Sequence, residues 1–126
     1  MKSIVAVFVG GVVGTGLRVA IDLAVPHLGA ILAINLVGSF ALGFLVARLW
    51  PAASAWLKAA LGPGLLGSFT TFSAVTVGVM ELYLRGEWMP ALAYLAVTLL
   101  GGLAVAWLGL RAGAGRGSST AVESAR

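Results

Sequence analysis

The chain contains no cysteine, one histidine and four acidic residues among its 126 positions. Without cysteine, disulfides, thiolate nucleophiles and cysteine-based metal sites are excluded. The carboxylates are not clustered, and with a single histidine they provide no acid, base or nucleophile constellation. The sequence therefore predicts that the protein is not an enzyme.

Charge is scarce as well: 10% of the residues are charged, 60% are hydrophobic, and the mean hydropathy is +1.07. A soluble domain of this size needs more polar surface. Four apolar runs are long enough to cross about 30 Å of hydrocarbon, and they cover residues 3–25, 28–49, 57–84 and 88–110. We predict an all-α protein of the inner or plasma membrane with four transmembrane helices.

Basic residues are distributed unevenly over the loops and ends. With four spans both termini share a side, which carries Lys2, Arg48, Lys58, Arg111, Arg116 and Arg126. The opposite side has Arg85, and His27 if it is protonated. The positive-inside rule therefore predicts cytoplasmic termini. The net charge of +4 reflects topology and anionic membrane lipid rather than nucleic acid.

The domain boundary follows from composition. Residues 1–110 are expected to form one transmembrane domain. Residues 111–126 are rich in glycine, alanine and serine, which predicts a disordered C-terminal tail.

The third apolar run, in contrast to the others, contains a break signal. Residues 62–73 begin with Gly62-Pro63-Gly64 and end in a polar, aromatic stretch. Glycine and proline interrupt the helical hydrogen bonds, and non-helical backbone at membrane depth persists only where protein, water or an ion satisfies the freed groups. We therefore predict a broken third helix, a feature typical of transport paths.

Ionisable groups inside the spans are few. Arg18 and Asp22 stand four residues apart on one helical face and can form an ion pair, or Arg18 can extend to the interface as a snorkelling side chain. Arg18 is interpreted as a structural anchor of the first helix rather than a ligand. His27 follows a proline in a loop, where a solvated side chain is expected.

Neutral polar groups are more informative. Asn35 lies in an uncharged run, where an unpaired carboxamide costs a few kcal/mol. It either forms an interhelical hydrogen bond or faces an anion as a donor. An anion that crosses a membrane needs donors and ring edges that replace its hydration. Such groups accompany Asn35: Ser39, Thr70, Thr71, Phe72, Ser73, Tyr94 and Thr98.

Small residues four positions apart predict close helix packing. The pairs are Gly10 with Gly14, Ser39 with Gly43, and Gly102 with Ala106. They serve either packing within one chain or contact with a second subunit. Four helices enclose little volume, so a path across the membrane favours a dimer.

Three motifs resemble the CrcB/Fluc fluoride channels. They are Gly10-Gly11-x-x-Gly14-x-x-x-Arg18, Asn35-Leu36-Val37-Gly38-Ser39-Phe40 and Gly67-Ser68-Phe69-Thr70-Thr71-Phe72-Ser73. The resemblance covers about the first 110 residues. It implies an antiparallel, dual-topology dimer that passively exports fluoride through two pathways. It also implies a structural Na⁺ at the dimer centre, held by the main-chain carbonyls that match Gly67 and Thr70.

The same resemblance implies a set of pathway residues, and the matching positions here are Asn35, Phe72, Ser73, Tyr94 and Thr98. Two positions depart from the family pattern. Val75 stands where a second phenylalanine is frequent, and Gly102 stands where a hydroxyl is expected.

The partner and the rival functions stay open at this point. The strong charge bias argues against insertion in both orientations, so a paralogous subunit of opposite topology is favoured over a homodimer. A small multidrug or guanidinium exporter is an alternative, and it needs a deep carboxylate, for which Asp22 is the candidate. A non-conducting accessory subunit is the other alternative.

Overall fold

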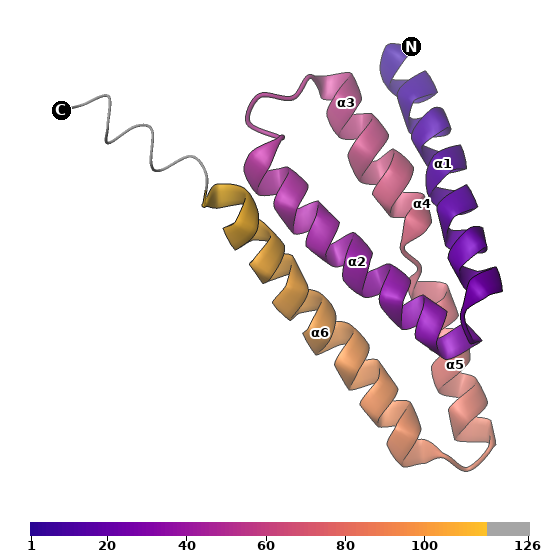
Figure 1. Ribbon diagram of the computed structural model, residues 1–126. Coiled ribbons are helices and arrows are strands. Elements are labelled where there is room, and N and C mark those ends of the chain that lie inside the picture. The colour runs from indigo at the N-terminus through magenta and orange to yellow at the C-terminus, as the bar shows by residue number, and fades with distance from the viewer. Residues whose placement is uncertain (116–126) are drawn as a thin grey trace.

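The computed structural model describes residues 1–115, and residues 116–126 lie outside the described part. The described chain is helical and forms four rods (Figure 1). The first two rods are α1 (Lys2–Ala24) and α2 (His27–Arg48), and the last is α6 (Trp88–Ala114). The third rod consists of α3 (Ala55–Ala59), η1 (Ala60–Leu66), α4 (Gly67–Phe69) and α5 (Phe72–Leu84).

All four rods are long and apolar enough to cross a bilayer, with hydropathy between 1.4 and 2.2. This confirms the predicted all-α, four-span class and a multi-pass membrane protein. The single-chain core is small: Ile34 and Val75 are 1% and 0% exposed, whereas Phe8 and Leu103 are 71% and 72% exposed. The apolar outer faces are therefore surfaces for lipid or for another subunit.

The last helix extends beyond residue 110, where the C-terminal tail was expected to begin. α6 continues past residue 110 to Ala114, so Arg111 is helical and not part of a tail. The reason is packing, because Gly109 and Gly113 lie directly against the backbone of α2. The Arg111 guanidinium also stacks 4.1 Å from the centroid of the Trp107 ring. The rest of the predicted tail lies outside the described residues.

Small residues close two seams within the chain. α2 packs most extensively against α6 (Figure 1), and a Cβ built on Gly43 would overlap the Ala106 carbonyl oxygen. α1 packs against η1 and α4. There, a Cβ on Gly10 would overlap the carbonyl of Ala60, and one on Gly14 that of Leu65. These glycines therefore serve packing within one chain.

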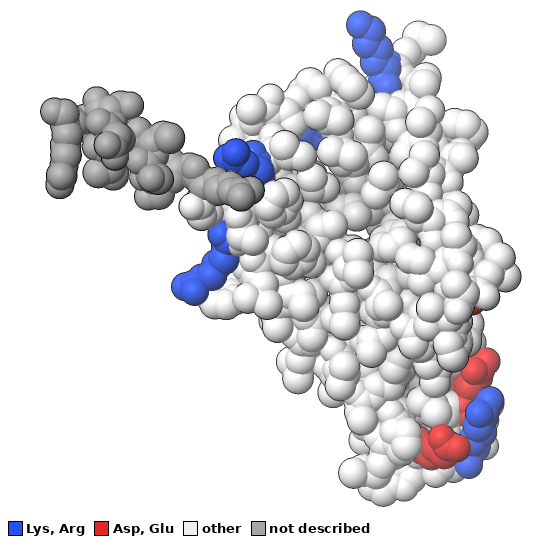
Figure 2. Space-filling model, in the orientation of Figure 1, with Lys and Arg blue, Asp and Glu red and all other residues white. Residues whose placement is uncertain are grey.

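The charged side chains separate to the two ends of the rods (Figure 2). Lys2, Arg48, Lys58 and Arg111 lie where α1 and α3 begin and where α2 and α6 end. The opposite end carries the described acidic residues, Asp22, Glu81 and Glu87, together with Arg85, and Figure 2 shows red and blue atoms together at one end of the molecule. The structure thus places the described basic residues as the loop analysis predicted.

Candidate functional site

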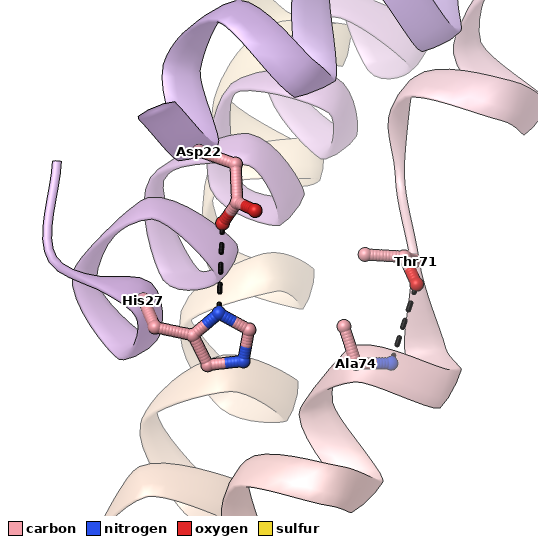
Figure 3. A network of polar contacts seen from close by, with 4 residues as sticks. All are labelled: Asp22, His27, Thr71 and Ala74. Atoms are coloured by element: carbon pink, nitrogen blue, oxygen red, sulfur yellow. Dashed lines mark hydrogen bonds and ion pairs between the residues drawn. The ribbon is translucent and has the colours of Figure 1, made fainter. Parts of the chain in front are cut away.

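The third rod is broken at Thr70 and Thr71. Both residues are extended, with φ and ψ of −77° and 155° for Thr70 and −151° and 118° for Thr71. α5 starts at Phe72, and the Thr71 hydroxyl accepts a hydrogen bond from the Ala74 amide at 3.3 Å (Figure 3). Thr71 is therefore the N-cap of the second half of the span.

The glycine–proline stretch is not where the chain leaves the helix. Gly62, Pro63 and Gly64 lie within η1, a π-helical segment that accommodates the proline. The break comes several residues later, at Thr70. The sequence signal therefore predicted an interrupted span correctly but began the interruption too early.

Asn35 joins α2 to the break. Its Nδ2 donates to the Thr71 carbonyl and its Oδ1 accepts from the Thr71 amide, both at 2.9 Å. The carboxamide thus replaces the partners that an extended residue loses inside a membrane. The interhelical hydrogen bond, one of the two interpretations of Asn35, is present. One amide hydrogen is not used in this pair, because a carboxamide carries two.

The break frees main-chain carbonyls. In a continuous helix the Thr71 amide would donate to Gly67 O, but here it donates to Asn35. Likewise the Ala74 amide would donate to Thr70 O, but it donates to the Thr71 hydroxyl. The Ser68 and Phe69 carbonyls, at the end of α4, also lack their helical donors among the described residues. Gly67 and Thr70, which the sequence analysis proposed as cation ligands, are thus two of the four residues whose carbonyls lose these donors.

A groove of about 750 Å³ runs along the break, between α2, the third rod and α6. It collects polar and aromatic residues from all three rods. Five predicted site residues line it: Asn35, Gly67, Thr70, Phe72 and Thr98. Ser39, Thr71 and Gly102 also line this groove.

Phe72 and Ser73 differ although they are neighbours. The Phe72 ring is 65% exposed at the start of α5 and lines the groove. Ser73 is exposed beside the groove lining, and its hydroxyl lies 3.1 Å from the Thr71 hydroxyl. Only Phe72 therefore presents its side chain to the groove in a single chain.

Tyr94 and Thr98 lie one turn apart on α6. Thr98 is 7% exposed, and its hydroxyl donates to the Tyr94 carbonyl at 2.8 Å. The Tyr94 ring packs against Gly78 of α5, where a Cβ would lie 3.3 Å from the ring. The Tyr94 hydroxyl is buried with no hydrogen-bond partner in residues 1–115. Tyr94 thus sits behind the groove wall rather than on it.

The two departures from the family pattern have different structural meanings. Val75 is fully buried, so this position contributes to the core of the chain and not to the groove. Gly102 lines the groove. In this chain, only the second departure changes the groove surface.

Arg18 lies on α1 and does not line the groove. The Arg18–Asp22 ion pair is not formed in the part of the chain that the structure describes. Asp22 Oδ1 instead lies 3.6 Å from His27 Nδ1, because the turn at Pro26 brings the first residue of α2 back toward α1 (Figure 3). His27 is 53% exposed, as expected for a solvated side chain, and it lies beside Asp22. The sequence analysis also passed over Glu81, an exposed acidic residue near the end of α5.

Comparison with known proteins gives a consistent answer. A family model described as CrcB-like protein, Camphor Resistance (CrcB), matches residues 5–110. The Fluoride-specific ion channel FluC of Gloeobacter violaceus is 39% identical over 121 residues, covering 86% of this chain and 94% of that protein.

Two further relatives carry numbered names. Fluoride-specific ion channel FluC 2 of Ligilactobacillus salivarius is 36% identical over 112 residues, covering 87% of this chain and 84% of that protein. FluC 1 of Cutibacterium acnes is 38% identical over 112 residues, with coverages of 81% and 78%. The family match spans all four rods and the break, and the chain belongs to the CrcB-like family.

Proposed function

We propose that this protein is a fluoride-selective channel that lets fluoride leave the cytoplasm passively. The single observation that carries the proposal is the groove at the break, where Asn35 holds Thr71 and lines a path of neutral groups. The names of the relatives, which are fluoride-specific ion channels, support the choice of ion.

The groove chemistry suits a small, strongly hydrated anion. Asn35 supplies an amide donor and Phe72 an exposed ring whose positive edge attracts an anion. Neutral donors replace hydration without trapping the ion as a fixed cation would. Hydrogen fluoride crosses lipid as a neutral acid and ionises inside the cell, so the membrane potential drives the anion outward through such a path.

The same break fits a structural Na⁺. The carbonyls of Gly67 and Thr70 have lost their helical donors and lie on residues that line the groove. Hard cations prefer oxygen ligands and take more than two of them. The remaining ligands would come from the matching carbonyls of a second subunit. Gly67 and Thr70 would hold such an ion through these carbonyls, and its positive charge would offset the carbonyl dipoles exposed at the break.

The second subunit is proposed to be antiparallel and, from the charge distribution, a paralogue of opposite topology. Four described basic residues gather at one end and the acidic residues at the other (Figure 2). A chain with this bias inserts in one orientation, with cytoplasmic termini. Relatives named FluC 1 and FluC 2 are consistent with paralogous pairs. Co-expression with the paralogue is expected to raise fluoride flux, and full flux from purified homodimers would contradict the pairing.

The proton-coupled exporter loses support from the structure. It needs a carboxylate deep in the membrane, but Asp22 lies at the end of α1, is 47% exposed and pairs with His27. Glu81 is exposed near the end of α5. Neither group lines the groove.

Ion efflux from liposomes tests the proposal. Purified protein is reconstituted and efflux is read with fluoride and chloride electrodes, for the wild type and for Asn35→Asp. We expect selective fluoride release from the wild type and at least a roughly hundredfold slower release from the variant, because a carboxylate repels the anion and lacks the amide donor. Equal release of both halides would defeat the selectivity claim. No release at all, alone or with the paralogue, would favour a non-conducting accessory subunit.

A further inference from the structure

The hydroxyl groups that line the groove are not equivalent. Thr70 and Thr98 each donate to the carbonyl four residues earlier, at 2.9 and 2.8 Å. Thr71 caps α5 and pairs with a neighbouring serine. The Ser39 hydroxyl takes part in no hydrogen bond among the described residues. Among the hydroxyl-bearing residues that line the groove, Ser39 is thus the one whose hydroxyl has no hydrogen-bond partner in the described part of the chain.

This state of Ser39 is unusual for a serine inside a membrane helix. Such a hydroxyl ordinarily bonds to the carbonyl one turn earlier, since hydrocarbon offers no other partner. Ser39 follows Asn35 by four residues, so both occupy one face of α2, and both line the groove. The helix rises about 6 Å over four residues, so the two residues form successive steps along the groove.

Gly102 of α6 lies next to this serine, where α2 and α6 meet at the groove. A Cβ built on Gly102 would lie 3.5 Å from Ser39 Oγ, at ordinary van der Waals contact. The missing side chain therefore leaves room beside the hydroxyl. A serine at position 102 would fit there and place a second hydroxyl next to the first.

From these contacts we propose that Ser39 donates a hydrogen bond to the permeating anion and replaces the hydroxyl that α6 lacks at Gly102. The inference rests on the proposed fluoride pathway and adds a residue to it. The ligand is a small anion that accepts hydrogen bonds from Asn35 and from Ser39 in succession as it moves along the groove. In this proposal the hydroxyl donor comes from α2 instead of α6, and the groove still has successive neutral donors.

The test compares fluoride efflux from liposomes for the wild type, Ser39→Ala, Gly102→Ser and the double variant. Hydrogen bonds to charged groups are stronger than neutral ones, so we expect Ser39→Ala to conduct roughly tenfold more slowly. The double variant is expected to regain most of the flux, because the serine at 102 reaches the same space. Thr76→Val is the matched control, since the Thr76 hydroxyl donates to the Phe72 carbonyl outside the groove.

The outcomes separate this inference from the proposed function. If the wild type releases no fluoride, alone or together with the paralogue, the channel proposal itself fails. If the wild type conducts and Ser39→Ala matches Thr76→Val, the role of Ser39 is overturned. If Gly102→Ser conducts but does not rescue Ser39→Ala, the proposal that Ser39 replaces a hydroxyl at position 102 is overturned. Should Ser39→Ala not be recovered folded, Ser39→Cys keeps the volume with a weaker donor and is expected to be slower as well.

Discussion

The α2–α6 seam and the contact at the break both involve α2, but they are formed by different residues and have different consequences. In the seam, Gly43 brings a backbone carbonyl of α6 so close that no side chain fits between the helices. At the groove, Asn35 of the same helix holds the third rod through two hydrogen bonds of 2.9 Å. Close packing at Gly43 leaves no space between α2 and α6. The carboxamide of Asn35 instead holds the third rod by hydrogen bonds, and an open groove remains beside it.

The difference shows how a small chain divides its tasks. A van der Waals seam needs small residues and tolerates no added atom. The two hydrogen bonds between Asn35 and Thr71 restrain only these two residues. A neighbouring side chain such as Phe72, which is 65% exposed, is not held by them. The seam therefore joins α2 and α6 tightly, whereas the hydrogen bonds between Asn35 and Thr71 leave an open groove beside them.

The seam is expected to give the largest effect. Gly43→Ala places a Cβ onto the Ala106 carbonyl, and overpacking of this kind costs about 1–3 kcal/mol. The variant should yield much less monodisperse protein by size-exclusion chromatography and a lower melting temperature. Gly11→Ala is the control, because nothing lies within 4 Å of a Cβ at that position. Equal behaviour of the two variants would show that the seam is not tightly packed.

The groove is expected to respond in flux rather than in stability. Phe72→Ala removes an exposed groove-lining ring, so we expect several-fold slower fluoride efflux with a melting temperature close to that of the wild type. Electrode measurements and thermal unfolding of one preparation check both. A large loss of stability in the isolated chain would mean that Phe72 belongs to its core and would break the contrast with the seam.

The turn between α1 and α2 is expected to give the smallest effect, because it belongs to neither region. Asp22 and His27 are about half exposed, at 47% and 53%, and their oxygen and nitrogen lie 3.6 Å apart. Exposed pairs of this kind contribute below about 1 kcal/mol. Asp22→Asn should leave fluoride efflux unchanged within error. Loss of transport in this variant, together with dependence on a proton gradient, would instead revive the exporter.

Much of the site was within reach of the sequence. The asparagine motif and the motif around Thr70 and Phe72 identified groups that the structure brings to one groove. Sequence reasoning placed Tyr94 on the pathway, whereas a single chain holds its ring against Gly78. The i+4 spacing also suggested an Arg18–Asp22 pair, yet the turn offers His27 as the nearer partner. Helical spacing shows which groups share a face, but it does not show what that face meets.

The sequence by itself determined the four apolar spans, the charge asymmetry and the presence of an interruption in the third span. These properties are local, since hydropathy and loop charge act segment by segment during insertion. Only the tertiary structure decided that the interruption falls at Thr70 and Thr71 while Pro63 stays helical. The reason is a contact between residues 36 positions apart, in which Asn35 satisfies the two backbone groups that the Thr71 peptide exposes.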